Sequence, residues 1–93
     1  MTKLNRIGLI AVATVMGLGV TTTAMAASKA DCRAYADLAV NQYARMQALN
    51  LGCTGFRWHN WYDGHYRWCR STSKASARSE AIVRQRALFT GQC

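Results

Sequence analysis

DCRAYADLAVNQYARMQALNLGC, residues 31–53, is the stretch that decides the fold. It holds no proline and its apolar residues recur at helical spacing, so we expect one helix over about residues 31–51. Ser28, three residues before Asp31, resembles the start of a capping box, and Gly52 can end the helix in the left-handed conformation. The apolar face of this helix would consist of Cys32, Tyr35, Ala36, Ala39, Tyr43 and Met46.

The length of this helix limits how the cysteines can pair. Cys32 and Cys53 flank it, and at about 1.5 Å per residue they would lie roughly 30 Å apart. A disulfide needs Cα atoms within about 7 Å of each other, which excludes this pair and the complementary one. In an up-down-up bundle each flanking cysteine shares an end with a later one. We therefore predict the disulfides Cys32–Cys69 and Cys53–Cys93.

The segment before this helix has the plan of a secretory leader. Lys3 and Arg6 precede an apolar run over residues 7–20, and Ala24-Met25-Ala26 offers a small-residue cleavage signal. The alternative is an uncleaved anchor, although the apolar run is shorter than the about 20 residues that span a bilayer. We expect cleavage near Ala26 and a periplasmic or secreted product.

The predicted organisation is a signal peptide over residues 1–26 and one domain over residues 27–93. A domain of this size buries only about 60% of its unfolded surface, so its core alone gives little stability. The chain has four cysteines, which in an exported protein indicate two disulfides. A metal site or free thiols are the alternative, but the CxxC spacing common in zinc sites is absent. No second long apolar run occurs, so no transmembrane segment is expected after cleavage.

Two further helices are expected beyond a glycine-containing turn over residues 52–56. The first covers about residues 60–70, although Gly64 weakens it by roughly 1 kcal/mol relative to Ala. The second covers about residues 76–90 and ends at Gly91. Its expected core face consists of Ala81, Ile82, Gln85, Leu88 and Phe89, with Arg78, Arg84 and Arg86 at the sides or back. The predicted fold class is all-α, a small three-helix domain stapled by two disulfides.

Aromatic, histidine and arginine residues are densest over residues 56–69. Trp58, Trp61, His65 and Trp68 fall on one helical stripe, which is typical of a core. We therefore expect these tryptophans inside and His65 as a hydrogen-bonded interior histidine. The residues expected to face outward are His59, Asp63, Tyr66, Arg67 and Arg70. The alternative is a binding face on which aromatic planes stack on sugar rings or bases while arginines hold anions. Its candidate residues are Arg57, Trp58, His59, Tyr66, Arg67 and Arg70.

The chain carries a formal net charge of +8, and ten of its twelve Lys and Arg residues follow the leader. Such a surplus favours an anionic envelope polymer or a lipid surface as partner. Scattered charges that simply solvate the surface are the alternative. The exported compartment and the absence of a docking motif argue against nucleic acid.

Few residues suit catalysis or metal binding. The chain has four acidic residues and two histidines, and Asp63 and His65 would diverge by about 200 degrees on a helix. The cysteines are expected in disulfides. We therefore predict no enzyme and no catalytic residue. His59, Asp63 and His65, with Met46, offer metal ligands, but the two histidines lack the i, i+4 spacing and would lie on different faces. We predict no metal and no cofactor.

A pattern of cysteines, aromatic residues and glycines runs through Cys32, Tyr35-Ala36, Ala39-Val40, Gln42, Gly52-Cys53, Gly55, Arg57-Trp58, His65 and Trp68-Cys69. In this pattern the chain resembles a group of small exported four-cysteine helical proteins of Gram-negative bacteria. The resemblance spans about residues 32–69. It implies an envelope compartment and supports the pairing of Cys69, and it brings no activity with it.

These observations predict a non-enzymatic exported protein that binds an anionic or sugar-containing component of the cell envelope. The alternative is a cationic membrane-active or toxin-like peptide, since Trp and Arg are frequent, although such peptides usually show one continuous basic face. A periplasmic metal-binding protein is the third possibility. The sequence leaves the oligomeric state open.

Overall fold

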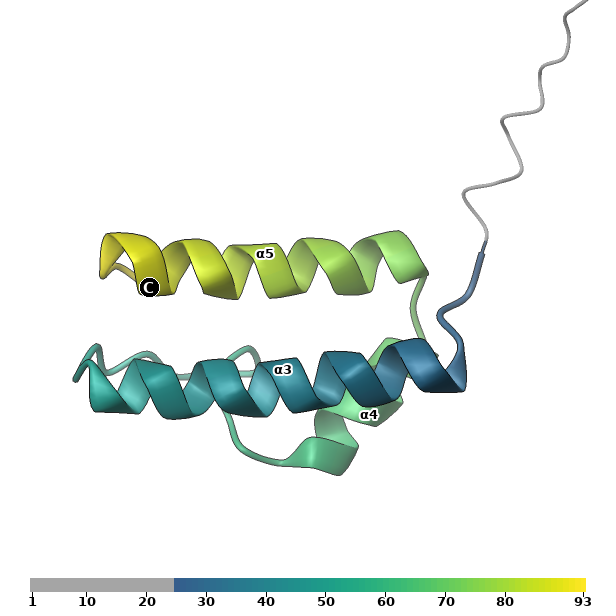
Figure 1. Cartoon of the computed structure of the whole chain (residues 1–93), viewed down its shortest axis with the longest axis horizontal. Coiled ribbons are helices and arrows are strands. Elements are labelled where there is room, and N and C mark those ends of the chain that lie inside the picture. Colours follow the sequence, from purple (N-terminus) through teal and green to yellow (C-terminus); the bar gives the residue numbers. More distant parts are fainter. Residues whose placement is uncertain (1–24) are drawn as a thin grey trace, which may run out of the picture.

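The structure, a computed structural model, describes residues 25–93, so the predicted leader lies outside the described residues except for its last two. Three helices follow one another: α3 (Lys29–Ala48), α4 (Tyr62–Arg70) and α5 (Lys74–Thr90). α3 packs against both others. In Figure 1 the two long helices run side by side in the same direction, and the extended segment together with α4 forms the return leg. The predicted all-α three-helix fold is confirmed.

Serine caps place the starts of α3 and α5 two residues earlier than predicted. The backbone N–H of Asp31 donates to Ser28 Oγ at 3.0 Å, and the Ser28 N–H donates to Asp31 Oδ2 at 3.1 Å. This is the predicted capping box, with Lys29 as the first helical residue. Ser73 caps α5 in the same way, accepting from the N–H of Ser76 at 3.0 Å.

Residues in the left-handed backbone conformation follow the C-terminal ends of α3 and α5. α3 ends at Ala48, earlier than predicted, and Asn50 takes a φ of 57° before Gly52 takes one of 70°. Asparagine tolerates this conformation better than most residues, so the turn begins ahead of the glycine. α5 ends at Thr90 with Gly91 at a φ of 75°, as expected.

Both predicted disulfides are present. The Cα atoms of Cys32 and Cys69 are 5.5 Å apart, and those of Cys53 and Cys93 are 5.6 Å apart. The first bridge joins the beginning of α3 to the end of α4. The second joins the turn after α3 to the residue three positions beyond α5. The two bridges therefore fasten opposite ends of the bundle.

The core consists of two small apolar clusters, one at each disulfide. The first contains Ala27, Cys32, Tyr35, Ala39, Cys69 and Ala77, and the second contains Met46, Cys53, Trp58, Ala87 and Leu88. Seven of these eleven residues are alanine or cysteine, so the apolar area that the two clusters bury is limited. The disulfides therefore carry much of the stability that a larger core would supply.

A buried polar pair lies between the two clusters. Gln42 of α3 and Arg84 of α5 are 3% and 1% exposed, and Arg84 Nε donates to Gln42 Oε1 at 2.7 Å. Gln42 Nε2 donates in turn to the carbonyl oxygen of Ala81 at 3.1 Å. The prediction that Arg84 lies at the side or back of its helix is wrong. Its guanidinium is hydrogen-bonded to the Gln42 amide and lies over the ring of Tyr35, with 5.0 Å between Cζ and the ring centroid.

The burial of Arg84 belongs to a rotation of the whole core face of α5. Ile82 and Phe89, predicted on that face, are both exposed. The buried residues of α5 are Ala77, Arg84, Ala87 and Leu88. Alanines therefore make up half of this buried set, and two of the larger apolar side chains, Ile82 and Phe89, are left outside.

The tryptophan prediction is correct for Trp58 and wrong for the other two. Trp58 is 6% exposed, whereas Trp61 is 58% and Trp68 is 41% exposed. α4 begins only at Tyr62. Trp58 and Trp61 therefore precede the helix, and the helical stripe assumed from the spacing does not form.

The chain enters α3 along the turn between α4 and α5. Ala26 and Ser73 form an isolated antiparallel bridge, and the N–H of Lys74 donates to the carbonyl oxygen of Met25 at 3.2 Å. Ala27 is buried in the first cluster. Among the helices that the structure describes, none has the length and apolar character needed to cross a bilayer.

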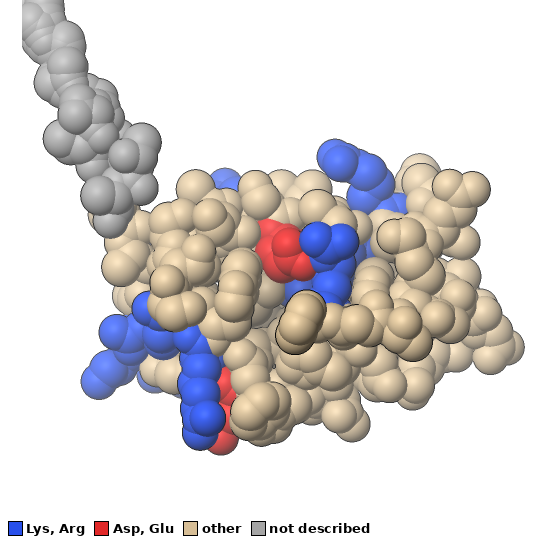
Figure 2. Space-filling view, turned by 180° about the vertical axis from the view of Figure 1, so that it is seen from behind, with Lys and Arg blue, Asp and Glu red and all other residues tan. Residues whose placement is uncertain are grey.

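Basic side chains occur in separate places rather than in one field. Figure 2 shows blue groups dispersed over one face, with acidic side chains lying against some of them. Ion pairs among the described residues join Arg57 to Glu80, Lys74 Nζ to Asp31 Oδ2 at 3.8 Å, and Arg84 Nη1 to Glu80 Oε2 at 4.0 Å. No continuous basic stripe appears on the face shown.

Candidate functional site

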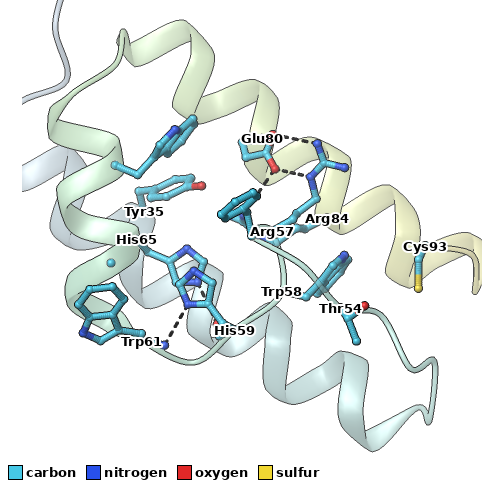
Figure 3. A pocket seen from close by; sticks show the side chains of 13 residues that line it. Tyr35, Thr54, Arg57, Trp58, His59, Trp61, His65, Glu80, Arg84 and Cys93 are labelled. Carbon is cyan, nitrogen blue, oxygen red and sulfur yellow. Dashed lines mark hydrogen bonds and ion pairs between the residues drawn. The ribbon is translucent and has the colours of Figure 1, made fainter.

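A cleft of about 780 Å³ opens between the loop before α4, α4 itself and the two long helices (Figure 3). Tyr35 comes from α3, and Glu80 and Arg84 come from α5. The loop and α4 supply the remaining walls. Their lining residues include Arg57, Trp58, His59, Trp61, His65 and Trp68. One part of the cleft is aromatic, and the other is charged.

The aromatic part depends on a glycine. Trp61, immediately before α4, folds back over Gly64, and a Cβ there would lie 2.4 Å from Trp61 Cε3. Arg67, one turn further along α4, places its guanidinium 5.6 Å from the Trp61 ring centroid. Trp68 lies 5.5 Å from the Tyr35 ring in a tilted arrangement. The cleft therefore presents two partly exposed indoles near a buried phenol.

Two histidine rings stack in the wall of the cleft. The ring centroids of His59 and His65 are 3.9 Å apart with an interplanar angle of 8°. His65 Nε2 lies 2.9 Å from the carbonyl oxygen of His59, and the Trp61 N–H donates to His59 Nδ1 at 3.2 Å. The prediction of a buried, hydrogen-bonded His65 is confirmed. The prediction that the two rings lie on different faces is wrong, because His59 is in the loop that folds against α4.

The surroundings of His65 disfavour its charged form. Burial lowers the pKa of His65 below its ordinary value of 6.5, the charges of His59 and Arg84 lower it further, and the hydrogen bond to the His59 carbonyl opposes the shift. The neutral ring is therefore the form that fits the folded protein.

We expect stability to fall as the pH is lowered from about 6.5 toward the folded-state pKa of His65. In that window the unfolded chain binds more protons than the folded one, so the loss is at most about 1.4 kcal/mol per pH unit from this group. Below the folded-state pKa both states are protonated and the loss levels off. Urea unfolding at a series of pH values measures this loss of unfolding free energy. The variant His65→Gln replaces the ring N–H by an amide donor that does not titrate, so it should lack this slope. An equal slope in both proteins would exclude His65 as its source.

The charged part of the cleft holds two guanidinium groups and one carboxylate. Both oxygens of Glu80 accept from Arg57, through Nε and through Nη2 at 3.3 Å. Arg84 Nη1 lies 4.0 Å from Glu80 Oε2. The Glu80 carboxylate raises the pKa of Arg57, and burial raises the pKa of Tyr35 against the opposing effect of Arg84. Arg84 Nη2 is buried without a hydrogen-bond partner among the described residues.

The structure brings only half of the candidate binding residues to the cleft. Arg57, Trp58 and His59 line it, with Trp58 as part of the core behind it. Tyr66 packs against the first core cluster, and Arg70 Nη1 donates to its hydroxyl at 3.5 Å. Arg70 and Arg67 are exposed and are absent from the lining.

Sequence reasoning missed the part of the cleft that α3 and α5 supply. Tyr35 was assigned to the core, and Arg84 to the outside of its helix. The i, i+4 spacing of Glu80 and Arg84 was the available signal, since this spacing places opposite charges side by side on a helix. Nothing in the sequence shows that Arg57, far away in the chain, joins them.

Metal-ligating side chains are not clustered in the described part of the chain. No group of three or more His, Cys, Asp or Glu side chains over residues 25–93 is arranged to hold a metal ion. The two histidine rings are stacked in parallel, so their nitrogen lone pairs do not converge on a point between them.

Replacing Gly64 with Ala is expected to displace Trp61 without unfolding the domain. Alanine favours the helix by about 1 kcal/mol over glycine, but its Cβ would collide with the Trp61 ring. Trp emission and the thermal midpoint measure the two effects. In a Trp61→Ala background the same change should give the full gain in stability. Unchanged emission with a lower midpoint would contradict this account.

No protein-family model, curated protein or solved structure matches the chain, so the geometry of the cleft is the observation from which a function is inferred.

Proposed function

We propose that this protein is a non-enzymatic exported binding protein whose cleft holds an anionic or sugar-containing component of the cell envelope. The observation that carries the proposal is the joining of exposed indoles and paired arginines in one cleft. Its volume, about 780 Å³, lies within the range of about 300–1,000 Å³ typical of ligand pockets.

The exposed aromatic side chains support a binding role. A small disulfide-bonded domain gains stability by burying its tryptophans, yet Trp61 and Trp68 are 58% and 41% exposed. Both line the same cleft. Indole rings offer flat apolar faces and a hydrogen-bond donor at the edge, which suits the C–H faces and hydroxyls of a sugar ring.

The distribution of charge favours a ligand of limited size. The basic side chains are dispersed on the face shown in Figure 2, whereas peptides that lie on membranes present one continuous basic face. Two of the arginines converge on the cleft around Glu80. An anionic group bound there would interact with these two arginines rather than with the net positive charge of the whole surface.

Glu80 and the two histidines are engaged in holding the shape of the cleft. Both Glu80 oxygens accept from Arg57, and each histidine has a nitrogen paired with a backbone group. This arrangement supports positioning and binding rather than proton transfer. Two disulfides support an oxidising compartment, in agreement with the predicted leader and with the resemblance to exported envelope proteins.

Tryptophan emission tests the proposal directly. The oxidised protein is titrated with soluble peptidoglycan fragments and, separately, with anionic vesicles, at low and high salt. A saturable shift with the fragments that disappears in Trp61→Phe/Trp68→Phe supports binding in the cleft. Trp58→Phe, which alters the buried indole, serves as the matched control. No saturable shift with the fragments would contradict a sugar-polymer ligand.

A membrane-active protein is the second candidate, and two exposed phenylalanines favour it. Phe56 and Phe89 are 99% and 89% exposed. Exposed apolar rings insert into the interfacial region of a bilayer. A salt-sensitive blue shift with vesicles, together with leakage of a trapped dye, would favour this candidate over the first.

A further inference from the structure

We infer that the charged part of the cleft binds the carboxylate of an acidic sugar, with Arg84 and Arg57 as its partners. This inference rests on the proposed function, because it names the class of ligand held in the same cleft. Three observations carry it: the charge imbalance around Glu80, the burial of Arg84, and the aromatic walls that adjoin them.

The charge imbalance is one positive unit. Arg57 and Arg84 both approach Glu80, which supplies a single carboxylate. Glu80 is engaged in two hydrogen bonds by Arg57, while Arg84 Nη1 is 4.0 Å from its nearer oxygen, beyond hydrogen-bond range. The pairing is therefore complete for Arg57 and incomplete for Arg84.

Burial makes this incomplete pairing costly. The Arg84 side chain is 1% exposed, its Nε is bonded to Gln42, and its Nη2 has no partner among the described residues. A buried guanidinium retains a strong demand for an anion, and no second carboxylate among the described residues pairs with it. Arg84 also lines the cleft, so an anion that enters the cleft can meet this demand.

A carboxylate suits the site better than a phosphate. Glu80 already shows how a planar carboxylate pairs with a guanidinium there, using both oxygens. One carboxylate carries one negative charge and would balance the surplus. A phosphate group, with about −1.5 to −2 charge near neutral pH, would exceed it.

The aromatic walls of the cleft indicate that the ligand is larger than a single carboxylate group. Trp61, Trp68 and Tyr35 line the same cleft as the two arginines. Its volume of about 780 Å³ holds far more than a carboxylate. A sugar that carries its acid on the ring would place the carboxylate against Arg84 and its C–H face against an indole.

Two saccharides of equal length, one acidic and one neutral, test the inference. The oxidised protein is titrated by calorimetry with trigalacturonate and with galactotriose at low salt. We expect the acidic saccharide to bind at least about tenfold more tightly, which corresponds to one charge-assisted hydrogen bond. An equal affinity for both would overturn the acid-binding part while leaving sugar binding intact. Binding of neither would overturn this inference and count against the proposed function as well.

The variant Glu80→Gln provides an internal test with a gain of affinity. It keeps the side-chain shape and removes the carboxylate that competes for Arg57 and Arg84. We expect several-fold tighter binding of trigalacturonate and unchanged binding of galactotriose. Asp37→Asn, an exposed position on α3, changes the net charge by the same amount and should have no such effect. Equal gains in both variants would show a general charge effect and overturn the site.

An acidic peptide brings the same carboxylate without a sugar ring. Tri-glutamate is therefore the third probe. Weaker binding than trigalacturonate supports the saccharide, and binding of equal strength would overturn it. The thermal midpoint of each variant, measured alongside, verifies that the domain is folded.

Discussion

The variant Cys32→Ala/Cys69→Ala is expected to lose about 4 kcal/mol of unfolding free energy from the loss of chain restriction alone. The bridge spans 37 residues, and both cysteines are fully buried in the first core cluster. A core of this size supplies only about 3–5 kcal/mol unaided. The loss is therefore comparable with the whole contribution of the core, and the variant should unfold at a much lower temperature than the native protein, which circular dichroism at 222 nm would show.

The second disulfide provides the matched comparison. Cys53–Cys93 spans 40 residues, so its entropic contribution is almost the same. Cys93 is exposed, however, and its removal leaves no buried cavity. Cys53→Ala/Cys93→Ala should therefore lose less stability than Cys32→Ala/Cys69→Ala. Equal losses would mean that packing around the first bridge adds nothing, and a larger loss in the second would contradict the account.

Gln42→Ala is expected to cost about 3 kcal/mol, a large effect for a neutral side chain. The Gln42 amide oxygen accepts a hydrogen bond from Arg84 Nε, and its amide nitrogen donates one to the Ala81 carbonyl oxygen. Removing it leaves a buried guanidinium with a second unpaired nitrogen. Urea unfolding of the oxidised protein measures the loss. A cost below about 1 kcal/mol would show that Arg84 finds another partner.

A paired apolar replacement separates the hydrogen bond from simple packing. Gln42→Leu/Arg84→Met fills similar volume and leaves no buried charge, so most of the lost stability should return. The single variant Gln42→Leu should remain destabilised, because Arg84 is still buried without its amide partner. If the double variant is no more stable than the single one, the polar pair is not the source of the effect.

The sequence was sufficient for the fold because its main constraint is covalent. The uninterrupted helix over residues 29–48 keeps Cys32 and Cys53 apart, and only a few bundle geometries then bring four cysteines into two pairs. Caps such as Ser28 with Asp31 are local and were recognised. Errors of a few residues at helix ends come from equally local competition, as at Asn50, which turns before Gly52 does.

The cleft was only partly predictable because it depends on contacts between distant residues. Helical spacing identified the aromatic segment and a helix over about residues 60–70, but it extended the helical stripe back to Trp58, whereas α4 starts at Tyr62. A buried arginine is rare, so periodicity alone assigns Arg84 to the surface. Its burial depends on Gln42, which is on another helix. The stacking of the histidines likewise depends on how the loop folds back.

The common direction of α3 and α5 makes the domain an electric dipole. Parallel neighbours add their macrodipoles instead of cancelling them, with about +0.5 elementary charge at each N-terminus and −0.5 at each C-terminus. Both N-termini lie at the end fastened by Cys32–Cys69, and both C-termini lie at the end fastened by Cys53–Cys93 (Figure 1). An anionic group close to the first turns of these two helices therefore meets both partial positive charges together, so the direction in which the chain is wound makes the two ends of the domain electrostatically different.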